Sequence, residues 1–264
     1  MAIRVLMSGS GRMGREILAG LCAAEGVTPV GVLEGHAATG SFPLPDGSGD
    51  VPISPDAAAL AAETRPDVVV DFTFHAWTAQ AMPPLIDAGV RPVIGTSGLS
   101  EAQVAEIEGR CRDRGIGGAW ASNFAIGAVL MMHFARLAAP HYAAAEVIEL
   151  HHNGKVDAPS GTALATARAM EAARGATFAH QEPSTVTIPG TRGGESGGVG
   201  IHSVRLPGLV AHQEVIFGAP GELLTIRHDS MARVSFLPGV LLAIRAVMDG
   251  NEFIRGLEPL LGLR

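Results

Sequence analysis

The sequence of 264 residues lacks several features that would assign it to other protein classes. Its two cysteines, Cys22 and Cys111, have no metal-binding or redox spacing, which argues against a disulfide-rich scaffold and a cysteine metal site. No apolar run reaches the roughly 18 residues that a membrane span needs, and nothing before the first predicted strand resembles a signal peptide. The formal net charge of −7 offers no basic surface for nucleic acid or anionic membranes. We therefore expect a cytoplasmic protein with no nucleic-acid partner and no membrane.

Aromatic residues are also scarce, at 5% of the chain, whereas alanine and the 34 glycines are abundant. With 47% hydrophobic and 17% charged residues, the composition is typical of a globular protein. Small side chains suit closely packed layers of helices and strands. A chain of this length is expected to form two domains.

The N-terminal residues carry the pattern of a dinucleotide-binding unit. The segment 3–7, IRVLM, predicts a buried strand, and Gly9-Ser-Gly-Arg-Met-Gly14 follows it and opens a helix. In this pattern the first glycine allows the turn, the second the approach of a pyrophosphate, and the third the packing of helix on strand. The pattern therefore predicts a binding site for a dinucleotide at the start of that helix.

Glu34 strengthens this prediction. A second strand is predicted at 27–33, and Glu34 ends it, 20 residues after Gly14. A carboxylate at this place can accept hydrogen bonds from the ribose hydroxyls of a dinucleotide. The following residues, 35–54, are rich in Gly, Pro and Ser and predict an exposed loop.

The alternation of helix and strand then continues to about residue 120. Helices are predicted at 57–63, 76–88 and 101–114, and strands at 68–72, 92–94 and 117–120. The last two strands end in the turns Gly95-Thr96-Ser97-Gly98 and Ala121-Ser122-Asn123-Phe124. Ligands of open parallel sheets bind at the carboxyl ends of strands. On the residues alone, ordinary strand-to-helix turns explain these two segments equally well.

Beyond Asn123 strands follow strands, which indicates a mixed or antiparallel sheet. After a helix at 127–139 and the stretch described below, strands are predicted at 186–188, 200–206, 209–217 and 223–228. The glycine-rich segment 190–198 predicts a mobile loop near the site. A last helix, 236–248, is apolar enough to pack on the first domain.

The predicted fold class is therefore α/β, with a Rossmann-type doubly wound parallel sheet and a second α+β domain that has a mixed sheet. The dinucleotide-binding domain is expected to span residues 1–122 and to be completed by 234–264. The substrate-binding and oligomerisation domain is expected at 123–233.

Residues 146–166, EVIELHHNGKVDAPSGTALAT, hold the densest group of reactive side chains. A predicted strand is followed by His151, His152 and, after an Asn-Gly turn, Lys155. Ser160 is placed to cap the next helix, whose free N–H groups would favour an anion. The pattern predicts an acid/base site that binds a carboxylate, although a polar surface loop would have the same pattern. No metal is expected, because adjacent strand residues point to opposite faces and no HExxH or CxxC accompanies the histidines.

The segment ELHHNGKVDAPSGTA resembles the signature of the 4-hydroxy-tetrahydrodipicolinate reductase (dihydrodipicolinate reductase) family of diaminopimelate and lysine biosynthesis. The resemblance covers nearly the whole chain. It includes GSGRMG with Glu34, DFT at 71–73, GTSG at 95–98, ASNF at 121–124 and GIHSVR at 200–205. It implies reduction of 4-hydroxy-tetrahydrodipicolinate to tetrahydrodipicolinate by hydride transfer from NAD(P)H, in a homotetramer with a small dicarboxylate substrate.

The resemblance also implies roles for individual residues. His151 and Lys155 would be catalytic acid/base groups, and His152, Gly161 and Thr162 would bind the substrate. The residues expected to bind the cofactor come from the glycine turn, the end of the second strand and the two small-residue turns. They are Ser8, Gly9, Ser10, Gly11, Arg12, Met13, Glu34, Gly95, Thr96, Ser97, Ala121, Ser122, Asn123 and Phe124.

The residue after Glu34 bears on the choice of cofactor. Family members that use NADPH well commonly have an arginine there, whereas this chain has Gly35. We therefore expect NADH to be preferred, with NADPH as a possible second cofactor through Arg12. An arginine at position 35 is expected to narrow the preference.

Two other functions stay open on the sequence. The first is another nicotinamide-dependent oxidoreductase of similar fold, which would not need HHNGK before APSGT. The second is a non-catalytic NAD-binding protein, which would not need His151 together with Lys155.

Overall fold

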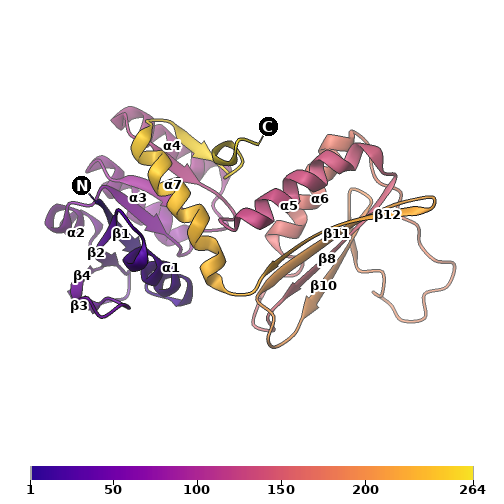
Figure 1. The fold of residues 1–264 in the computed structure, drawn as a ribbon, viewed down its shortest axis with the longest axis horizontal. Coiled ribbons are helices and arrows are strands. Elements are labelled where there is room, and N and C mark those ends of the chain that lie inside the picture. Colours follow the sequence, from indigo (N-terminus) through magenta and orange to yellow (C-terminus); the bar gives the residue numbers. More distant parts are fainter. Residues whose placement is uncertain (1, 264) are drawn as a thin grey trace. The chain divides into compact units, whose positions relative to one another are not determined.

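The computed structural model describes residues 2–263 and divides into two compact units (Figure 1). The first unit comprises Met1–Phe124 and Arg233–Arg264, and the second comprises Ala125–Ala232. The chain therefore leaves the first unit, forms the second and returns to the first.

The first unit is built on a mostly parallel sheet of eight strands in the order β13-β7-β6-β5-β1-β2-β4-β3. Strand β1 pairs in parallel with both β2 and β5, so the order of the strands reverses at β1. This reversal is the switch point at which ligands bind in doubly wound sheets. The strands of this sheet are β1 (Ile3–Ser8), β2 (Val27–Leu33), β3 (Gly40–Pro43), β4 (Asp50–Ser54), β5 (Val68–Asp71), β6 (Arg91–Ile94), β7 (Gly118–Trp120) and β13 (Phe253–Arg255).

Helices cover both faces of this sheet, as the predicted fold class requires (Figure 1). One face packs against α2 (Ala57–Thr64), α3 (His75–Asp87) and α4 (Glu101–Arg114) through a cluster of buried apolar residues. The other face carries α1 (Arg12–Ala23) and α7 (Leu237–Asp249), which contact each other. Helix α7 follows the short helix η2 (Arg233–Phe236), and η3 (Pro259–Leu261) comes after β13. The Rossmann-type part of the prediction is confirmed.

One prediction for this unit is wrong, and one strand was not predicted. Residues 35–54 are not only a loop, because β3 and β4 form an antiparallel hairpin and β4 extends the parallel sheet beside β2. Phe42, Val51 and Ile53 are buried there, and the surrounding Gly, Pro and Ser residues hid their alternation. Strand β13 was not expected either, because three residues between turns give no periodic pattern.

The second unit contains a mixed sheet of five strands in the order β12-β11-β8-β10-β9. Strand β8 pairs in parallel with β10 and antiparallel with β11, which confirms the predicted mixed sheet. Its strands are β8 (Ala144–His151), β9 (Gly194–Ser196), β10 (Val199–Arg205), β11 (Ala211–Ala219) and β12 (Glu222–Ser230). Helices α5 (Ile126–Ala138) and α6 (Gly161–Arg174) pack on one face of the sheet through a buried apolar cluster (Figure 1). The short helix η1 (Ala139–His141) follows α5 directly.

Two local expectations for this unit are also wrong. Residues 186–188 form no strand, and Val186 and Ile188 are exposed. The glycine-rich segment 190–198 contains the short strand β9, which pairs with β10. Here the local propensity was overridden by pairing with a neighbouring strand.

Candidate active site

The glycine turn between β1 and α1 has the shape that a pyrophosphate needs. Gly9 has a φ of +96°, in the region that favours glycine, and its N–H donates to the carbonyl of Leu33 at 2.9 Å. A Cβ on Gly14 would lie 2.0 Å from the carbonyl oxygen of Gly9. Gly11 precedes α1 without a side-chain cap and has open space around it, since a Cβ there would meet no atom within 4 Å. The turn therefore leaves helix N–H groups accessible to an anion, with Arg12 exposed and Met13 half-buried beside them.

Glu34 lies next to this turn and is oriented by it. One of its carboxylate oxygens, Oε2, accepts hydrogen bonds from the backbone N–H of Ser10 at 2.8 Å and from its hydroxyl at 2.7 Å. Burial alone would raise the pKa of Glu34, but the hydrogen bonds from Ser10 outweigh it and lower the pKa. Glu34 is therefore a fixed anion whose other oxygen, Oε1, can accept from a ribose hydroxyl.

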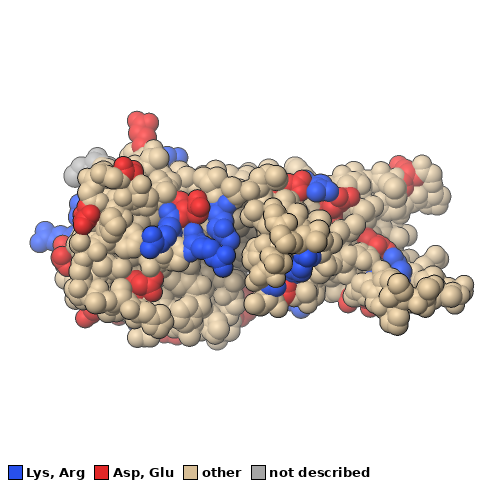
Figure 2. All heavy atoms as spheres, turned by 90° about the horizontal axis from the view of Figure 1, so that it is seen from below, with Lys and Arg blue, Asp and Glu red and all other residues tan. Residues whose placement is uncertain are grey.

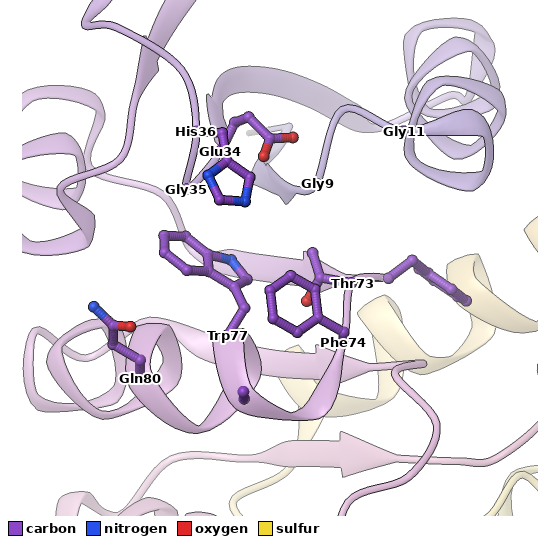
Figure 3. Close-up of a pocket in the computed structure, with 11 residues that line it drawn as sticks. Gly9, Gly11, Glu34, Gly35, His36, Thr73, Phe74, Trp77 and Gln80 are labelled. Atoms are coloured by element: carbon purple, nitrogen blue, oxygen red, sulfur yellow. The ribbon is translucent and has the colours of Figure 1, made fainter.

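A cavity of about 500 Å³ opens beside Glu34. Figure 3 shows Glu34 and His36 on one side of it and Trp77 and Phe74 on the other. Gln80 lies farther along the same helix, α3, as Trp77. The complete lining is Gly9, Gly11, Glu34, Gly35, His36, Phe72, Thr73, Phe74, Ala76, Trp77 and Gln80. An aromatic wall opposite a carboxylate suits an adenosine, which has a flat base and ribose hydroxyls.

Asp71, at the end of β5, ties the loops around this cavity together. Its side chain is fully buried, and four hydroxyl groups donate to it at 2.6–2.8 Å. These hydroxyls come from the ends of two further strands, from the residue after Phe72 and from α3. They belong to Ser8, Thr73, Thr78 and Thr96. Asp71 therefore fixes the carboxyl ends of β1, β5 and β6 relative to one another.

The predicted cofactor residues occupy different environments in this unit. The hydroxyls of Ser8 and Thr96 are buried and bonded to Asp71, so they stabilise the loops rather than face a ligand. Ala121 and Phe124 are also buried, and the Phe124 ring packs edge-on against Phe72 with centroids 5.5 Å apart. The other members of these two turns are at least partly accessible: Gly95, Ser97, Ser122 and Asn123.

The second unit presents the other predicted site at the junction of β8 and α6. The expected cap of α6 is confirmed, since the Ser160 hydroxyl accepts from the N–H of Ala163 at 3.2 Å. Gly161 is exposed, and no atom lies within 4 Å of where its Cβ would be. Thr162 follows and is half-buried. The first turn of α6 therefore offers accessible backbone N–H groups with the geometry of an anion site.

His151 is held by a buried ion-pair network. Its Nδ1 lies 2.5 Å from Oε2 of Glu149, whose side chain is fully buried. The guanidinium of Arg205 binds both oxygens of the same carboxylate, at 2.9 and 2.7 Å, and the backbone N–H of Ser160 donates to it at 3.3 Å. Burial would raise the pKa of Glu149, but hydrogen bonds, first from His151 and then from Arg205, lower it to about 2. An ionised carboxylate only accepts, so Nδ1 of His151 carries the proton and Nε2 is the nitrogen available to a ligand.

Lys155 lies on the turn after β8, and its ammonium is 2.7 Å from Asp157 Oδ1. The Lys155 side chain is mostly shielded from solvent, whereas that of Asp157 is half-exposed. His152 is half-buried, and its carbonyl accepts from the Lys155 N–H at 3.1 Å, which closes the turn. The structure therefore brings His151, His152, Lys155, Gly161 and Thr162 together on one loop and the first turn of the helix that follows it.

On the face drawn in Figure 2, small groups of Lys and Arg lie next to Asp and Glu, and most of the surface belongs to other residues.

Among the described residues no three His, Cys, Asp or Glu side chains are grouped as metal ligands would be. Within residues 2–263 no helix is long and apolar enough to cross a membrane.

Sequence reasoning gave no role to three charged groups of this site: Glu149, Asp157 and Arg205. Glu149 was recognisable, because it is two residues before His151 on a strand and so shares its face. Arg205 comes from β10, and only the pairing of β10 with β8 places it opposite His151. A further signal was overlooked: Lys155 is the only lysine among the 19 Lys and Arg residues of the chain.

Comparison with known proteins identifies the family. The family described as "Dihydrodipicolinate reductase, N-terminus" matches residues 3–124, and "Dihydrodipicolinate reductase, C-terminus" matches residues 127–261. The chain belongs to the dihydrodipicolinate reductase family. It is an NAD(P)H-dependent oxidoreductase of amino-acid biosynthesis that reduces the dihydrodipicolinate intermediate, as the resemblance predicted.

Full-length relatives agree with this assignment. A 4-hydroxy-tetrahydrodipicolinate reductase of Dehalococcoides mccartyi is 47% identical over 262 residues, covering 99% of each chain. One from Moorella thermoacetica is 46% identical over 98% of each chain. The solved dipicolinate-bound dihydrodipicolinate reductase of Paenisporosarcina sp. TG-14 is 40% identical and has a TM-score of 0.84, covering 98% of this chain and 99% of that one.

More distant structures share the fold alone. An amine dehydrogenase from Mycobacterium smegmatis has a TM-score of 0.65 at 16% identity and covers 94% of this chain. The architecture is therefore common to several dehydrogenases, and the reaction depends on the residues that each one places in it.

Proposed function

We propose that the first unit binds the nicotinamide cofactor at the glycine turn and the Glu34 cavity, and that the β8–α6 loop binds the dicarboxylate. A bound reduced nicotinamide supplies the hydride. Hydride addition to a conjugated imine leaves negative charge on the ring, so a proton has to come from the protein. The observation that carries the proposal is His151, which the buried Glu149 holds with Nε2 directed away from the carboxylate.

The substrate-binding groups of the proposal are the accessible start of α6 and the cations before it. Backbone N–H groups at Gly161 and the hydroxyl of Thr162 would bind one carboxylate of the substrate. His152 would bind the other end. The dipicolinate in the related solved structure is a small dicarboxylate, which supports a substrate of this class for the present chain.

Lys155 fits the acid/base role better than an arginine at this position would. An arginine keeps its proton at every relevant pH, whereas a lysine ammonium can give its proton away. All other members of the 19 Lys and Arg residues in the chain are arginines. We therefore assign to Lys155, together with His151, the delivery of the proton to the ring.

The test separates charge from proton transfer at this position. Lys155→Arg keeps the positive charge and is expected to keep the KM for substrate within a few fold while kcat falls by about 10² to 10⁴. Lys155→Ala should lose both, and His151→Gln should lose kcat. All three variants should bind NADH as the unmodified enzyme does, because both residues lie in the second unit. Near-normal turnover in the His151→Gln and Lys155→Arg variants would remove the two residues from the mechanism.

NADH is the preferred cofactor in this proposal. The only formally charged side chain lining the described cavity is the anionic Glu34, and neither Lys nor Arg contributes to it. A ribose phosphate would meet that carboxylate with like charge. We expect kcat/KM for NADH to exceed that for NADPH by at least a few fold. Equal or better kcat/KM with NADPH would contradict this choice.

The assembly proposed is a homotetramer formed through the sheet of the second unit. Helices α5 and α6 cover one face of this sheet, and alternate residues on its other face include Ile148, Leu150, Val204 and Ile216, all half-buried. Leu223 on β12 is 75% exposed. Light scattering should give four times the mass of the chain, and Leu223→Glu should lower it. A monomer at micromolar concentration would contradict the proposal.

Location in the cytoplasm stays a prediction of the sequence.

A further inference from the structure

Position 35 is closed to any side chain. A Cβ on Gly35 would lie 2.8 Å from Cζ3 and 2.9 Å from Cε3 of Trp77. The backbone of Gly35 is not in the positive-φ region, so the conformation itself accepts other residues. The indole of Trp77, and not the backbone, therefore requires glycine here.

The indole cannot yield freely. Its Nε1 donates to the Ser8 hydroxyl at 3.2 Å, and Ser8 is fully buried and bonded to Asp71 at 2.7 Å. Trp77 lies in the first turn of α3 and packs on the apolar cluster beneath it. Moving the indole would break a hydrogen bond to the network that fixes the loop ends of the sheet.

The same indole forms part of the wall of the cavity beside Glu34 (Figure 3). Its ring faces the carboxylate and His36 across the cavity. A flat aromatic surface across a cavity from the carboxylate proposed to bind the ribose is the kind of surface on which a purine base stacks.

We propose that Trp77 has two roles in cofactor binding, and this inference rests on the proposed function. Its indole is the surface on which the adenine of the cofactor stacks. It also reserves position 35 for glycine, so that a phosphate-binding side chain cannot enter there while Trp77 is present. The expectation that Gly35→Arg alone narrows the preference for NADH is revised accordingly: the arginine requires a smaller residue at position 77.

The experiment measures the Kd of NADH and NADPH by cofactor fluorescence, and kcat/KM for each, in four proteins: the unmodified enzyme, Gly35→Arg, Trp77→Ala and the double variant. Gly35→Arg alone should weaken both cofactors at least tenfold. Trp77→Ala should weaken both by similar factors of about 5 to 100, since stacking is lost for either. The double variant should bind NADPH at least tenfold better than Gly35→Arg does.

Gly40→Arg is the matched control, because Gly40 is in the same unit and no atom lies within 4 Å of where its Cβ would be. It should leave both Kd values within twofold. If Gly35→Arg does not fold, as judged by circular dichroism, Gly35→Ala replaces it, since a single methyl group already meets the indole. Trp77→Phe should retain most of the affinity that Trp77→Ala loses.

Two results would overturn the inference. One is a Gly35→Arg enzyme that gains NADPH affinity with Trp77 in place, and the other is an unchanged NADH Kd in Trp77→Ala. Failure of the proposed function gives a different result, because the unmodified enzyme would then bind neither cofactor.

Discussion

The two units each bury one carboxylate, and the two carboxylates are stabilised by different kinds of partner. Asp71 and Glu149 both have fully buried side chains. Asp71 accepts from four hydroxyls, and among the described residues no cation pairs with it. Glu149 is paired with the guanidinium of Arg205 and with His151.

This difference in partners suits the two carboxylates to different roles, one structural and one in proton transfer. Hydroxyl groups do not change their charge in the physiological range, so the four donors to Asp71 stay neutral there. The Glu149 network instead includes an imidazole ring, the type of side chain that serves most often as a general acid or base. In the proposed mechanism this carboxylate would orient the ring and stabilise the imidazolium, as in catalytic His–carboxylate pairs. The buried carboxylate of the first unit therefore has a structural role, whereas that of the second unit belongs to the proposed acid/base site.

The largest expected effect comes from removing the carboxylate of Glu149 in the second unit. Glu149→Ala leaves the Arg205 guanidinium without its partner and should destabilise the second unit by about 3 to 5 kcal/mol. It should also lower kcat, because His151 loses its orientation. Hydrogen exchange of peptides from β8 and α6 in the full-length protein measures the first effect. Protection equal to that of the unmodified protein would show that the network contributes nothing to stability.

Acid should weaken the second unit through the same group. The pKa of Glu149 is lowered from 4.5 to about 2, so its contribution is complete above pH 4.5 and is lost as the pH falls towards 2. The shift corresponds to at most about 3 kcal/mol. Urea midpoints measured from pH 6 to 3 should fall for the unmodified protein and fall less for Glu149→Gln. Because other carboxylates also titrate, the difference between the two proteins is the quantity to compare.

The first unit should tolerate loss of the charge on Asp71 better than the second tolerates loss of Glu149. Asp71→Asn keeps the size and one acceptor oxygen, but its amide N–H₂ group faces hydroxyls that had been donating. Some of them can rotate to accept, so we expect a loss of about 1 to 3 kcal/mol. Both tryptophans of the chain, Trp77 and Trp120, belong to this unit, so their fluorescence during urea unfolding reports on it. A loss above that of Glu149→Ala would reverse the ranking.

The smallest effect is expected at the exposed end of the site. Asp157 pairs with Lys155 and its side chain is 52% exposed. Asp157→Asn should therefore change stability by less than about 1 kcal/mol. Thermal unfolding checks this, and salt should weaken the pair further. A larger loss would mean that the Lys155 ammonium depends on Asp157 as closely as Arg205 depends on Glu149.

The sequence was sufficient where a local pattern has a single structural solution. The glycine turn, its helix and Glu34 were predictable because backbone approach and helix polarity dictate them. Ser160 was predictable as a cap for the same reason. The hairpin of β3 and β4 was not, because its pairing with β2 is a tertiary contact and its own residues favour a loop.

The networks of the site were the harder part. Four hydroxyl residues meet at Asp71 from positions up to 63 residues away from it in the chain, and no spacing in one sequence indicates that. Arg205 reaches Glu149 from 56 positions away, through strand pairing that only the folded sheet defines. The contact between Gly35 and Trp77 is of the same kind, and it is the basis on which we revised the expected effect of Gly35→Arg.

The return of the chain to its first unit has a consequence for synthesis on the ribosome. Strand β7 pairs with β13 through Trp120 and Arg255, yet about 135 positions separate these two residues, which corresponds to about 7 to 27 seconds of translation. During that interval β7 is an unpaired edge, and an unpaired edge is a template for pairing with other chains. Strand β7 has only three residues, which limits this risk. The sheet of the first unit is therefore complete only after β13 has been synthesised.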